Sequence, residues 1–487
     1  MKQTINIFWF KRDLRTIDNS ALARAVKEKN RLLLIFTFDD ALLNDKHYTT
    51  RHHNFVNESL YDLNLFFKKF GCKVHSFEMN IISLFEELKS KFNIEKVFSH
   101  METGLKSSYD RDLKFKKYCK KNNIEWIEDI NNGVFRGLQS RKNWILNWNN
   151  YMKKKIRVFN PKVEDFVTLN KKFKFERKII KPKKSKFQCG GSTYALKYLE
   201  TFLETRIDKY QNNISKPELS RINCSRLSPY IAWGNLSTRY IWQRAKEKLN
   251  HGKSKFQING FTSRLRWEAH FIQKFEMESD MEFRSVNRGY EKQDKNINKT
   301  YIRAWENGET GYPLVDASMK CLIETGYLNF RMRAMLVSFF THHLWQPWKA
   351  GVVFLANNFL DFEPGIHYSQ FQMQAGETGI NMIRIYNPTK NAKEHDNEGL
   401  FIKKWIPKLK KIPVPLVFEP WKLSEIDQEM FDCKIGFDYP KPIIDISKTY
   451  KYAASKLWTI KNDIEVKKES KRILKKHTNS DRTAFDR

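Results

Sequence analysis

The first 130 residues alternate between short apolar runs and amphipathic helical patterns, and this alternation limits the possible folds more than any other feature. The apolar runs are rich in β-branched and aromatic residues and occupy residues 6–10, 32–38, 73–77 and 96–99. The helical patterns lie near residues 20–29, 51–70 and 108–121. Such alternation predicts an α/β domain with a doubly wound, Rossmann-like parallel sheet covered by helices on both faces. No glycine-rich phosphate loop follows the first run, so the usual dinucleotide site is not expected there.

Beyond residue 192 nearly every periodic segment is helical. The first of these segments follows GGST at residues 190–193, a favourable helix start, and its apolar residues are Leu196, Leu199, Phe202, Leu203 and Ile207. A chain of 487 residues is also too long for one ordinary core. We therefore predict an α/β domain at residues 1–130, an interdomain linker at 131–191, a larger all-helical domain at 192–441, and a C-terminal helix and tail at 442–487.

The formal net charge is +33, from 88 Lys and Arg against 55 Asp and Glu. Such a surplus favours a polyanionic partner, and nucleic acid is the first candidate. Lys, Asn and Ile are abundant throughout the chain, which indicates a compositional background and weakens this argument. A solvated surface segment explains the basic run at residues 169–186 better than a dedicated DNA contact does. The charge therefore supports DNA binding without proving it.

Cysteine usage and hydropathy indicate where the chain resides. Six cysteines, at positions 72, 119, 189, 224, 321 and 433, show neither a CxxC pair nor the spacing of a metal site. We expect no disulfide, no metal and the reducing environment of the cytoplasm. No run of 18 apolar residues occurs, so we also expect no membrane segment.

Seven motifs follow one another along the chain in a recognisable order. They are FWFKRDLRTIDN at residues 8–19, CSRLSPYIAWG at 224–234, AWENGETGYPLVDASMKCL at 304–322, TGYLNFRMRAM at 325–335, GIHYSQFQMQ at 365–374, RIYNP at 384–388 and HDNEGLFIKKWIPKL at 395–409. Together they resemble the photolyase and cryptochrome family, over nearly the whole chain. The resemblance implies an antenna-type α/β domain and a helical domain that binds FAD and carries catalysis. It also implies room for a second, light-harvesting pterin or deazaflavin, whose identity the residues do not reveal.

The resemblance assigns several residues to the FAD site. The turn that matches the segment holding the FAD pyrophosphate consists of Cys224, Ser225, Arg226, Leu227 and Ser228. Small hydroxyls and free backbone N–H groups suit an anion there, although most family members have Thr in place of Cys224. Tyr210 matches an FAD-contacting tyrosine, and Phe261 is assigned to the same site. An ordinary helix cap is the alternative interpretation of the turn.

A second group of residues matches positions around the flavin ring. Arg333 and Asp361 correspond to an ion pair beside the ring, and Glu363 corresponds to the position facing its pyrimidine edge. A purely structural salt bridge is the alternative, since a buried Arg and a buried carboxylate must be paired in any case. His367 stands opposite the reactive flavin nitrogen, where DNA-repairing relatives usually have Asn. An imidazole there can donate or accept a hydrogen bond, so we count His367 among the catalytic residues.

The resemblance further implies a DNA-binding face. Trp267 matches the aromatic residue that flanks the lesion in repair enzymes. Arg331 and Arg384 match residues near the DNA backbone, where the planar guanidinium fork suits phosphate. The partner implied by this face is DNA that contains pyrimidine dimers, bound by a monomer.

Three lesion-contacting positions depart from the family pattern. Cyclobutane-dimer photolyases usually have a Glu, an Asn and a second Trp where this chain has Arg264, Phe330 and Met373. Glu268 lies one helical turn after Arg264 and is a candidate catalytic replacement for the missing Glu. Pairing of Glu268 with Arg264 is the alternative. The histidine pair of (6-4) photolyases is also missing, since Phe330 and Ala334 occupy those positions.

The tryptophan chain that reduces the flavin in this family is interrupted. Trp348 matches its middle member and is assigned a catalytic role, but Phe371 and Lys295 stand at the inner and outer positions. A phenyl ring is harder to oxidise than an indole. We therefore predict that photoreduction is slow or follows another route, through residues such as Trp345 or Tyr368.

Three functions are compatible with this sequence. The leading hypothesis is a light-driven DNA repair enzyme of the deoxyribodipyrimidine photo-lyase type, in which excited FAD donates an electron to a pyrimidine dimer. A cryptochrome-like blue-light photoreceptor without repair activity is the alternative, favoured by the lost lesion contacts. A flavin-free, basic nucleic-acid-binding protein is the third and would contain no yellow cofactor.

Overall fold

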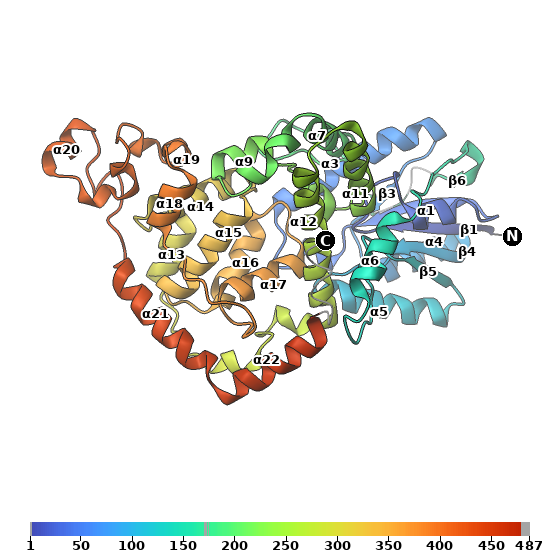
Figure 1. The fold of residues 1–487 in the computed structure, drawn as a ribbon. Helices are drawn as coiled ribbons and strands as arrows, with labels where there is room; N and C mark the ends of the chain where they lie inside the picture. Colours follow the sequence, from blue (N-terminus) through green and yellow to red (C-terminus); the bar gives the residue numbers. More distant parts are fainter. Residues whose placement is uncertain (1, 170–172, 174, 479–487) are drawn as a thin grey trace.

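The computed structural model describes residues 2–169, 173 and 175–478, and its fold confirms the predicted α/β domain followed by a helical domain (Figure 1). Five parallel strands form the sheet in the order β3-β2-β1-β4-β5, and a short sixth strand pairs with β2. The strands are β1 (Gln3–Phe10), β2 (Leu32–Thr37), β3 (His75–Phe77), β4 (Phe92–His100), β5 (Glu125–Asp129) and β6 (Phe166–Val167). The order reverses between β1 and β4, which creates a crevice at the carboxyl ends of these strands.

Helices cover both faces of the sheet and fasten it to the rest of the molecule. In this first part they are α1 (Ser20–Ala25), α2 (Asp40–Leu43), α3 (Thr50–Phe67), α4 (Ile81–Lys91), α5 (Lys106–Lys121) and α6 (Trp144–Lys153). Successive β1 residues point to opposite faces: Ile7 and Trp9 share a core with α4 and α5, and Phe8 and Phe10 share one with α3. The second core continues into the helical domain.

After Val167 the described helices and strands are all helices. They are α7 (Ser192–Glu204), α8 (Tyr210–Asn213), α9 (Pro217–Asn223), α10 (Ser228–Ala232), α11 (Thr238–Glu247), α12 (Lys255–Met277), α13 (Lys299–Asn307), α14 (Pro313–Thr325), α15 (Phe330–Ser338), α16 (Trp348–Asn358), α17 (Pro364–Gln374), α18 (Pro388–His395), α19 (Leu400–Trp405), α20 (Glu425–Met430), α21 (Ile446–Lys461) and α22 (Ile464–His477). Helices α12 and α17 pack closely together. None of the described helices combines the length and apolar character needed to cross a membrane.

Two segments are more ordered than the sequence indicates. The expected linker contributes β6 to the sheet and carries α6, whose Trp144 and Trp148 are buried. The expected C-terminal helix is in fact two helices, α21 and α22, which lie along the lower edge of the molecule in Figure 1. Residues 170–172 and 174 of the linker and 479–487 of the tail lie outside the described residues. The domain boundaries themselves stay predictions.

The segment after β1 docks on the helical domain through buried polar contacts. Arg15 donates to the carbonyl oxygen of Gly234 at 3.1 Å. Asp18 accepts from Ser237 Oγ at 2.6 Å and from Arg239 Nε at 2.9 Å, and both members of the Asp18–Arg239 ion pair are buried. Gly234 has φ +73°, and a Cβ there would lie 2.2 Å from the carbonyl oxygen of Arg12. The two domains therefore meet too closely at this point for any other residue.

Removing the charge of Asp18 tests this interface. Asp18 has φ 54°, a conformation that Asn also tolerates, so Asp18→Asn changes the charge with little backbone strain. Arg239 would then be buried without its anion, and we expect the free energy of unfolding to fall by about 3 to 5 kcal/mol in urea denaturation. The control Asp110→Asn, in an exposed pair with Lys106, should leave stability nearly unchanged. Equal stability of Asp18→Asn and the wild type would contradict this view of the interface.

Candidate functional site

Four of the residues assigned to the FAD site gather around Tyr327, which sequence reasoning did not single out. The guanidinium of Arg226 lies 3.7 Å from the centre of the Tyr327 ring, and that of Arg333 lies 6.0 Å away. Burial raises the pKa of Tyr327, and Arg226, Cys224, Arg333 and Asp361 all act on it electrostatically. The turn before α10, the start of α15 and the segment before α17 are thus brought to one place.

Arg333 and Asp361 form the expected ion pair. Arg333 Nη2 lies 2.8 Å from Asp361 Oδ2, Arg333 Nε donates to the carbonyl oxygen of Leu328 at 2.7 Å, and the guanidinium lies 4.0 Å from the centre of the Phe359 ring. The Asp361 side chain is 2% exposed, whereas that of Arg333 is 25% exposed. Asp361 is therefore buried in the protein, whereas part of the Arg333 side chain stays accessible.

Unsatisfied polar atoms in this cluster fit a polar ligand. Asp361 Oδ1, Arg226 Nε and Asn329 Oδ1 are buried and have no hydrogen-bond partner among the described residues. Buried polar atoms nearly always have partners, so three such atoms near one cluster need an explanation. A ligand with both anionic and hydrogen-bonding groups supplies one, and FAD has its pyrophosphate and flavin edges. The residues present therefore fit FAD.

The turn at residues 224–228 adopts a strained form. Arg226 has φ 58°, and its conformation is held by Gln188, which accepts from Arg226 Nη2 at 2.7 Å and donates to the Arg226 carbonyl oxygen at 2.9 Å. Ser225 and Ser228 are half-buried, and Leu227 is buried in the core. Burial raises the pKa of Cys224, so this thiol is neutral where the family usually has a hydroxyl.

Aromatic residues form one wall of the site. The ring centres of Tyr210 and Phe261 are 5.7 Å apart, and Phe202, from α7, packs 4.8 Å from Phe261. Burial raises the pKa of the Tyr210 phenol, while a hydrogen bond and the charge of Arg264 act in the opposite direction. Arg264 itself is exposed. It therefore connects the buried wall with the protein surface.

His367 on α17 is neutral and has one ring nitrogen engaged. Nε2 lies 2.8 Å from the carbonyl oxygen of Val352 and must be the protonated nitrogen, because a carbonyl only accepts. Burial lowers the pKa of His367 to about 3. Nδ1 is thus left as a hydrogen-bond acceptor. Phe371 packs 5.8 Å from His367, and Trp348 packs 6.4 Å from Phe371. The retained tryptophan is therefore separated from His367 by a phenyl ring.

The residues assigned to DNA lie at or near the surface of the helical domain. Trp267 is 38% exposed and Phe330 is 49% exposed, while Arg264 and Arg384 are also exposed. Arg331 and Met373 are half-buried. Trp267 packs on Phe271 with ring centres 5.8 Å apart. These placements are compatible with a binding face, and the roles of the residues stay predictions.

Glu268 is placed differently from Trp267. It lines a cavity between the two domains together with Arg12, Glu102, Ile272 and Glu363, which we call the interdomain cavity. Burial, helped by the carboxylates of Glu363 and Asp361, raises the pKa of Glu268 to about 8. The carboxyl group is therefore largely protonated at neutral pH. Glu268 therefore faces the interdomain cavity, and its catalytic role stays a prediction.

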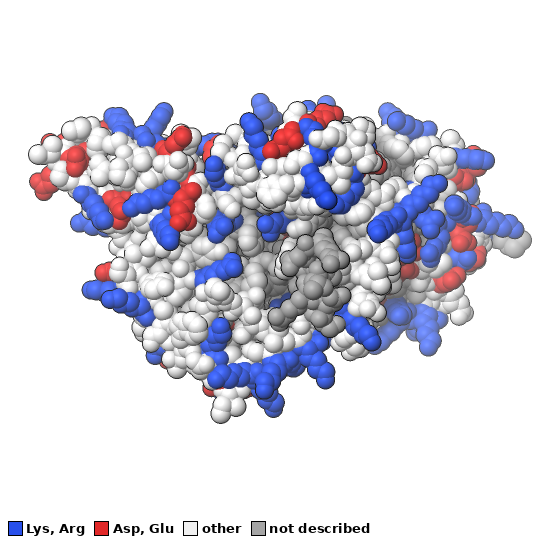
Figure 2. All heavy atoms as spheres, in the orientation of Figure 1, with Lys and Arg blue, Asp and Glu red and all other residues white. Residues whose placement is uncertain are grey.

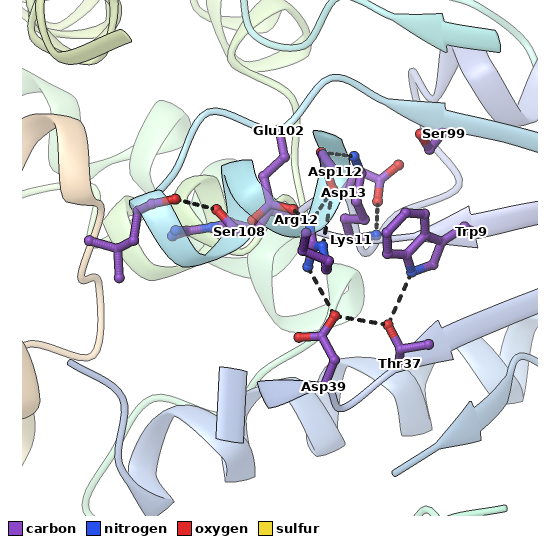
Figure 3. Close-up of polar contacts among 12 residues, drawn as sticks. Trp9, Lys11, Arg12, Asp13, Thr37, Asp39, Ser99, Glu102, Ser108 and Asp112 are labelled. Carbon is purple, nitrogen blue, oxygen red and sulfur yellow. Dashed lines mark hydrogen bonds and ion pairs between the residues drawn. The ribbon is translucent and has the colours of Figure 1, made fainter. Parts of the chain in front are cut away.

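A second cavity lies at the carboxyl ends of β1 and β2, and we call it the sheet-end cavity. Its lining includes Trp9, Arg12, Asp39 and Glu102, which are labelled in Figure 3. Arg111 also lines it. The Arg111 guanidinium lies 3.2 Å from Asp39 Oδ2 and 2.6 Å from Glu102 Oε2. Asp39 Oδ1 is buried without a partner among the described residues. Parallel sheets bind ligands at this edge, so the cavity is a second candidate ligand site.

Comparison with known proteins agrees with this architecture. Residues 6–162 match the family described as DNA photolyase, and residues 261–459 match the family described as the FAD binding domain of DNA photolyase. The chain belongs to the photolyase and cryptochrome family. FAD is accordingly the cofactor of its helical domain, as predicted.

Individual relatives carry both functional names. The chain is 32% identical to the deoxyribodipyrimidine photo-lyase of Alkalihalophilus pseudofirmus over 54% of its length and 55% of that protein. It is 27% identical to the cryptochrome DASH of Natronomonas pharaonis over 46% of its length and 48% of that protein. The matches thus span about half the length of these two relatives. Repair and light sensing are not distinguished by such names.

Solved structures support the fold. A class III photolyase from Agrobacterium tumefaciens superposes with a TM-score of 0.83 at 20% identity, over 95% of this chain and 99% of that one. An archaeal photolyase from Sulfolobus tokodaii, described with two FAD molecules and the implication of a novel light-harvesting cofactor, gives a TM-score of 0.77 at 24% identity, over 93% of this chain and 99% of that one. At these identities the similarity shows the fold alone.

The Arg333–Asp361 pair generates a prediction about cofactor affinity. Asp361→Asn keeps the shape of the side chain but removes the charge that orients Arg333. We expect FAD affinity to fall by about tenfold or more, the usual effect of losing a hydrogen bond between charged groups. Fluorescence titration of flavin-free protein with FAD measures this. Glu324→Gln, in an exposed pair with Lys186, is the control. Unchanged FAD affinity in Asp361→Asn would show that the pair is only structural.

Glu268 generates a prediction about pH. Its pKa rises from 4.5 to about 8 on folding, so between these values the folded protein holds a proton that the unfolded chain has released. This contribution to stability is complete below pH 4.5 and is lost as the pH rises through about 8. Glu268→Gln should therefore gain stability relative to the wild type between roughly pH 5 and 9, measured by urea denaturation. If the free energy of unfolding changes with pH in the same way in both proteins, the raised pKa of Glu268 is refuted.

Proposed function

We propose that this protein is a light-driven DNA repair enzyme of the deoxyribodipyrimidine photo-lyase type, which splits UV-induced pyrimidine dimers. Bound FAD supplies the chemistry, as the light-absorbing electron donor. Ser225, Arg226 and Ser228 would hold its pyrophosphate, and Tyr210 and Phe261 would pack against it. Arg333, Asp361, Glu363 and His367 would orient the flavin ring.

One observation carries the proposal: helix α12 joins the aromatic wall of the site, formed by Tyr210 and Phe261, to the protein surface. Phe261 and Leu265 of this helix are 3% exposed and face the core, whereas Arg264 and Trp267 of the same helix reach the surface. A damaged base stacked on Trp267 would thus lie within a few helical turns of Phe261 in the aromatic wall of the site. Aromatic stacking does not depend on the base and contributes about 1 to 3 kcal/mol per base.

Charge supports DNA as the partner. Figure 2 shows Lys and Arg over much of the visible face, with a basic band along its lower edge over α22. The net charge of +33 adds a sequence-independent attraction for phosphate. Arg331 and Arg384 are suited to positioning the DNA backbone without reading its sequence. We expect the protein to act as a monomer on this partner.

A photoreceptor without repair activity is the second candidate. Arg264, Phe330 and Met373 stand where lesion contacts are expected, and none of them offers the hydrogen bonds of Glu or Asn. The cryptochrome DASH of Natronomonas pharaonis is also among the relatives. This candidate predicts flavin photochemistry without dimer splitting.

We also propose that the sheet-end cavity holds the second chromophore, a pterin or a deazaflavin. Its support is the unsatisfied Asp39 Oδ1, the charged Arg111 and the indole of Trp9, which offer both hydrogen bonds and a flat surface. The Sulfolobus tokodaii photolyase, described with two FAD molecules and the implication of a novel light-harvesting cofactor, supports this proposal.

Trp267 gives the decisive test of repair. Protein with chemically reduced FAD is illuminated with blue light in the presence of a cyclobutane-dimer oligonucleotide, single-stranded and duplex. We expect repair by the wild type and an affinity for the dimer about tenfold weaker in Trp267→Ala. The control Trp458→Ala removes a 58% exposed tryptophan from α21. Absence of repair on both substrates by photoactive, flavin-loaded protein would favour the photoreceptor instead.

A further inference from the structure

Tyr368 of α17 forms a hydrogen-bonded chain with two residues of the α/β domain. Its hydroxyl lies 2.6 Å from His47 Nε2, and His47 Nδ1 lies 2.6 Å from Asp45 Oδ1. Ser107 donates to the other oxygen of Asp45 at 2.8 Å. Tyr368 is 1% exposed and His47 is fully buried, with its ring stacked on Phe362 at 5.4 Å. The chain crosses the domain interface away from solvent.

The directions of these hydrogen bonds follow from the charge of Asp45. Burial would raise the pKa of Asp45, but hydrogen bonds from His47 and Ser107 outweigh it and lower the pKa. The ionised carboxylate only accepts, so His47 Nδ1 must carry a proton, and an imidazole with a single proton then offers Nε2 as an acceptor. The Tyr368 hydroxyl therefore donates to His47. Burial raises the pKa of Tyr368, so the phenol stays protonated until it is oxidised.

Tyr368 lies directly beside the retained tryptophan. The ring centres of Tyr368 and Trp348 are 6.0 Å apart, at an interplanar angle of 87°. Tyr368 also packs 5.9 Å from His367, its neighbour in sequence. A phenol with a base in place is much easier to oxidise than a phenol alone, because loss of the electron and loss of the proton occur together. The surroundings of Tyr368 therefore suit electron donation.

The other candidate route is poorly suited to electron donation. Lys295 Nζ is buried and lies 4.8 Å from the centre of the Trp345 ring, and its partner Glu377 is 3.6 Å away. Burial lowers the pKa of Lys295, whereas Glu377 favours its charged form. Whenever Lys295 is charged, a positive charge at this distance opposes removal of an electron from the indole. The lysine that replaces the outer tryptophan thus disfavours oxidation of its neighbour Trp345.

We propose that Tyr368 is the terminal electron donor in the photoreduction of oxidised FAD, with His47 as its proton acceptor and Asp45 as the residue that positions His47. Bound FAD would supply the light-absorbing oxidant. The Trp348 indole would give up one electron to it, and Tyr368 would return one electron to Trp348. The phenolic O–H bond breaks as the His47 Nε2–H bond forms. The products are a neutral tyrosyl radical and an imidazolium paired with the Asp45 carboxylate. This inference rests on the proposed flavin function.

The proton acceptor comes from the other domain. His47 and Asp45 precede α3 in the α/β domain, whereas Tyr368 and Trp348 belong to the helical domain. Glu282 and Tyr48 are the other ionisable groups near Tyr368, and both act on its pKa only through their charge. The relay is therefore complete only when the two domains are docked.

Electron paramagnetic resonance after blue illumination tests the proposal. FAD content and thermal stability in the dark are measured first; a protein that binds no FAD would overturn the proposed function and this inference with it. In flavin-loaded wild type we expect a tyrosyl radical whose spectrum narrows when the protein contains ring-deuterated tyrosine. Tyr368→Phe should lose this radical and reduce its flavin about tenfold more slowly. The control is Tyr312→Phe, which changes a buried tyrosine that donates only to the carbonyl oxygen of Ile444. This control should keep the radical and the wild-type rate of flavin reduction.

Variants of the proton path separate its role from packing. His47→Gln should keep FAD but lose the radical. In D2O, photoreduction of the wild type should slow, whereas photoreduction of His47→Gln should not. Should His47→Gln fail to fold, Asp45→Asn serves the same purpose, because it leaves the imidazolium without its anion. A tyrosyl radical that persists in Tyr368→Phe, or photoreduction at the wild-type rate in both Tyr368→Phe and the proton-path variant, would overturn the proposal.

Discussion

Arg12, at the end of β1, is the residue on which the arrangement of the two domains depends. Its Nε donates to the carbonyl oxygen of Ala232 and its Nη2 to that of Phe362, each at 2.9 Å, and Nη2 lies 3.2 Å from Glu363 Oε2. Burial would lower the pKa of Arg12, but Glu363 and other nearby groups outweigh this effect and raise it. One cation just after β1 thus fixes the end of α10 and the segment before α17, and it lines both cavities.

The chemistry proposed for this protein is therefore a property of both domains. Glu363, which is assigned to the flavin edge, is held by a residue of the α/β domain. Tyr368 finds its proton acceptor there as well. The interdomain cavity brings the protonated Glu268 close to the same carboxylate. An interface built from buried charges demands accurate docking, because each unpaired charge would be costly.

Sequence reasoning found the strands that apolar runs indicate and the site residues that lie in the family motifs. Short apolar runs revealed four of the strands, and the motifs led to Arg333 and Asp361. Strand β5 was missed because its residues are only half-buried and the run carries three acidic residues. Tyr327 and the Tyr368–His47 contact escaped because they depend on residues up to 321 positions apart. Glu268 lines the interdomain cavity, which helical spacing alone does not reveal, and its catalytic role stays a prediction.

Titration of flavin-free protein with FAD, followed by flavin fluorescence, tests the central claim most directly. The polar cluster around Tyr327 and its unsatisfied buried atoms predict saturable binding of FAD in the helical domain. Because that cluster lies beside the Arg12 contacts, we predict that bound FAD also raises the melting temperature of the whole molecule. Absence of saturable binding, or binding without stabilisation, would contradict the account.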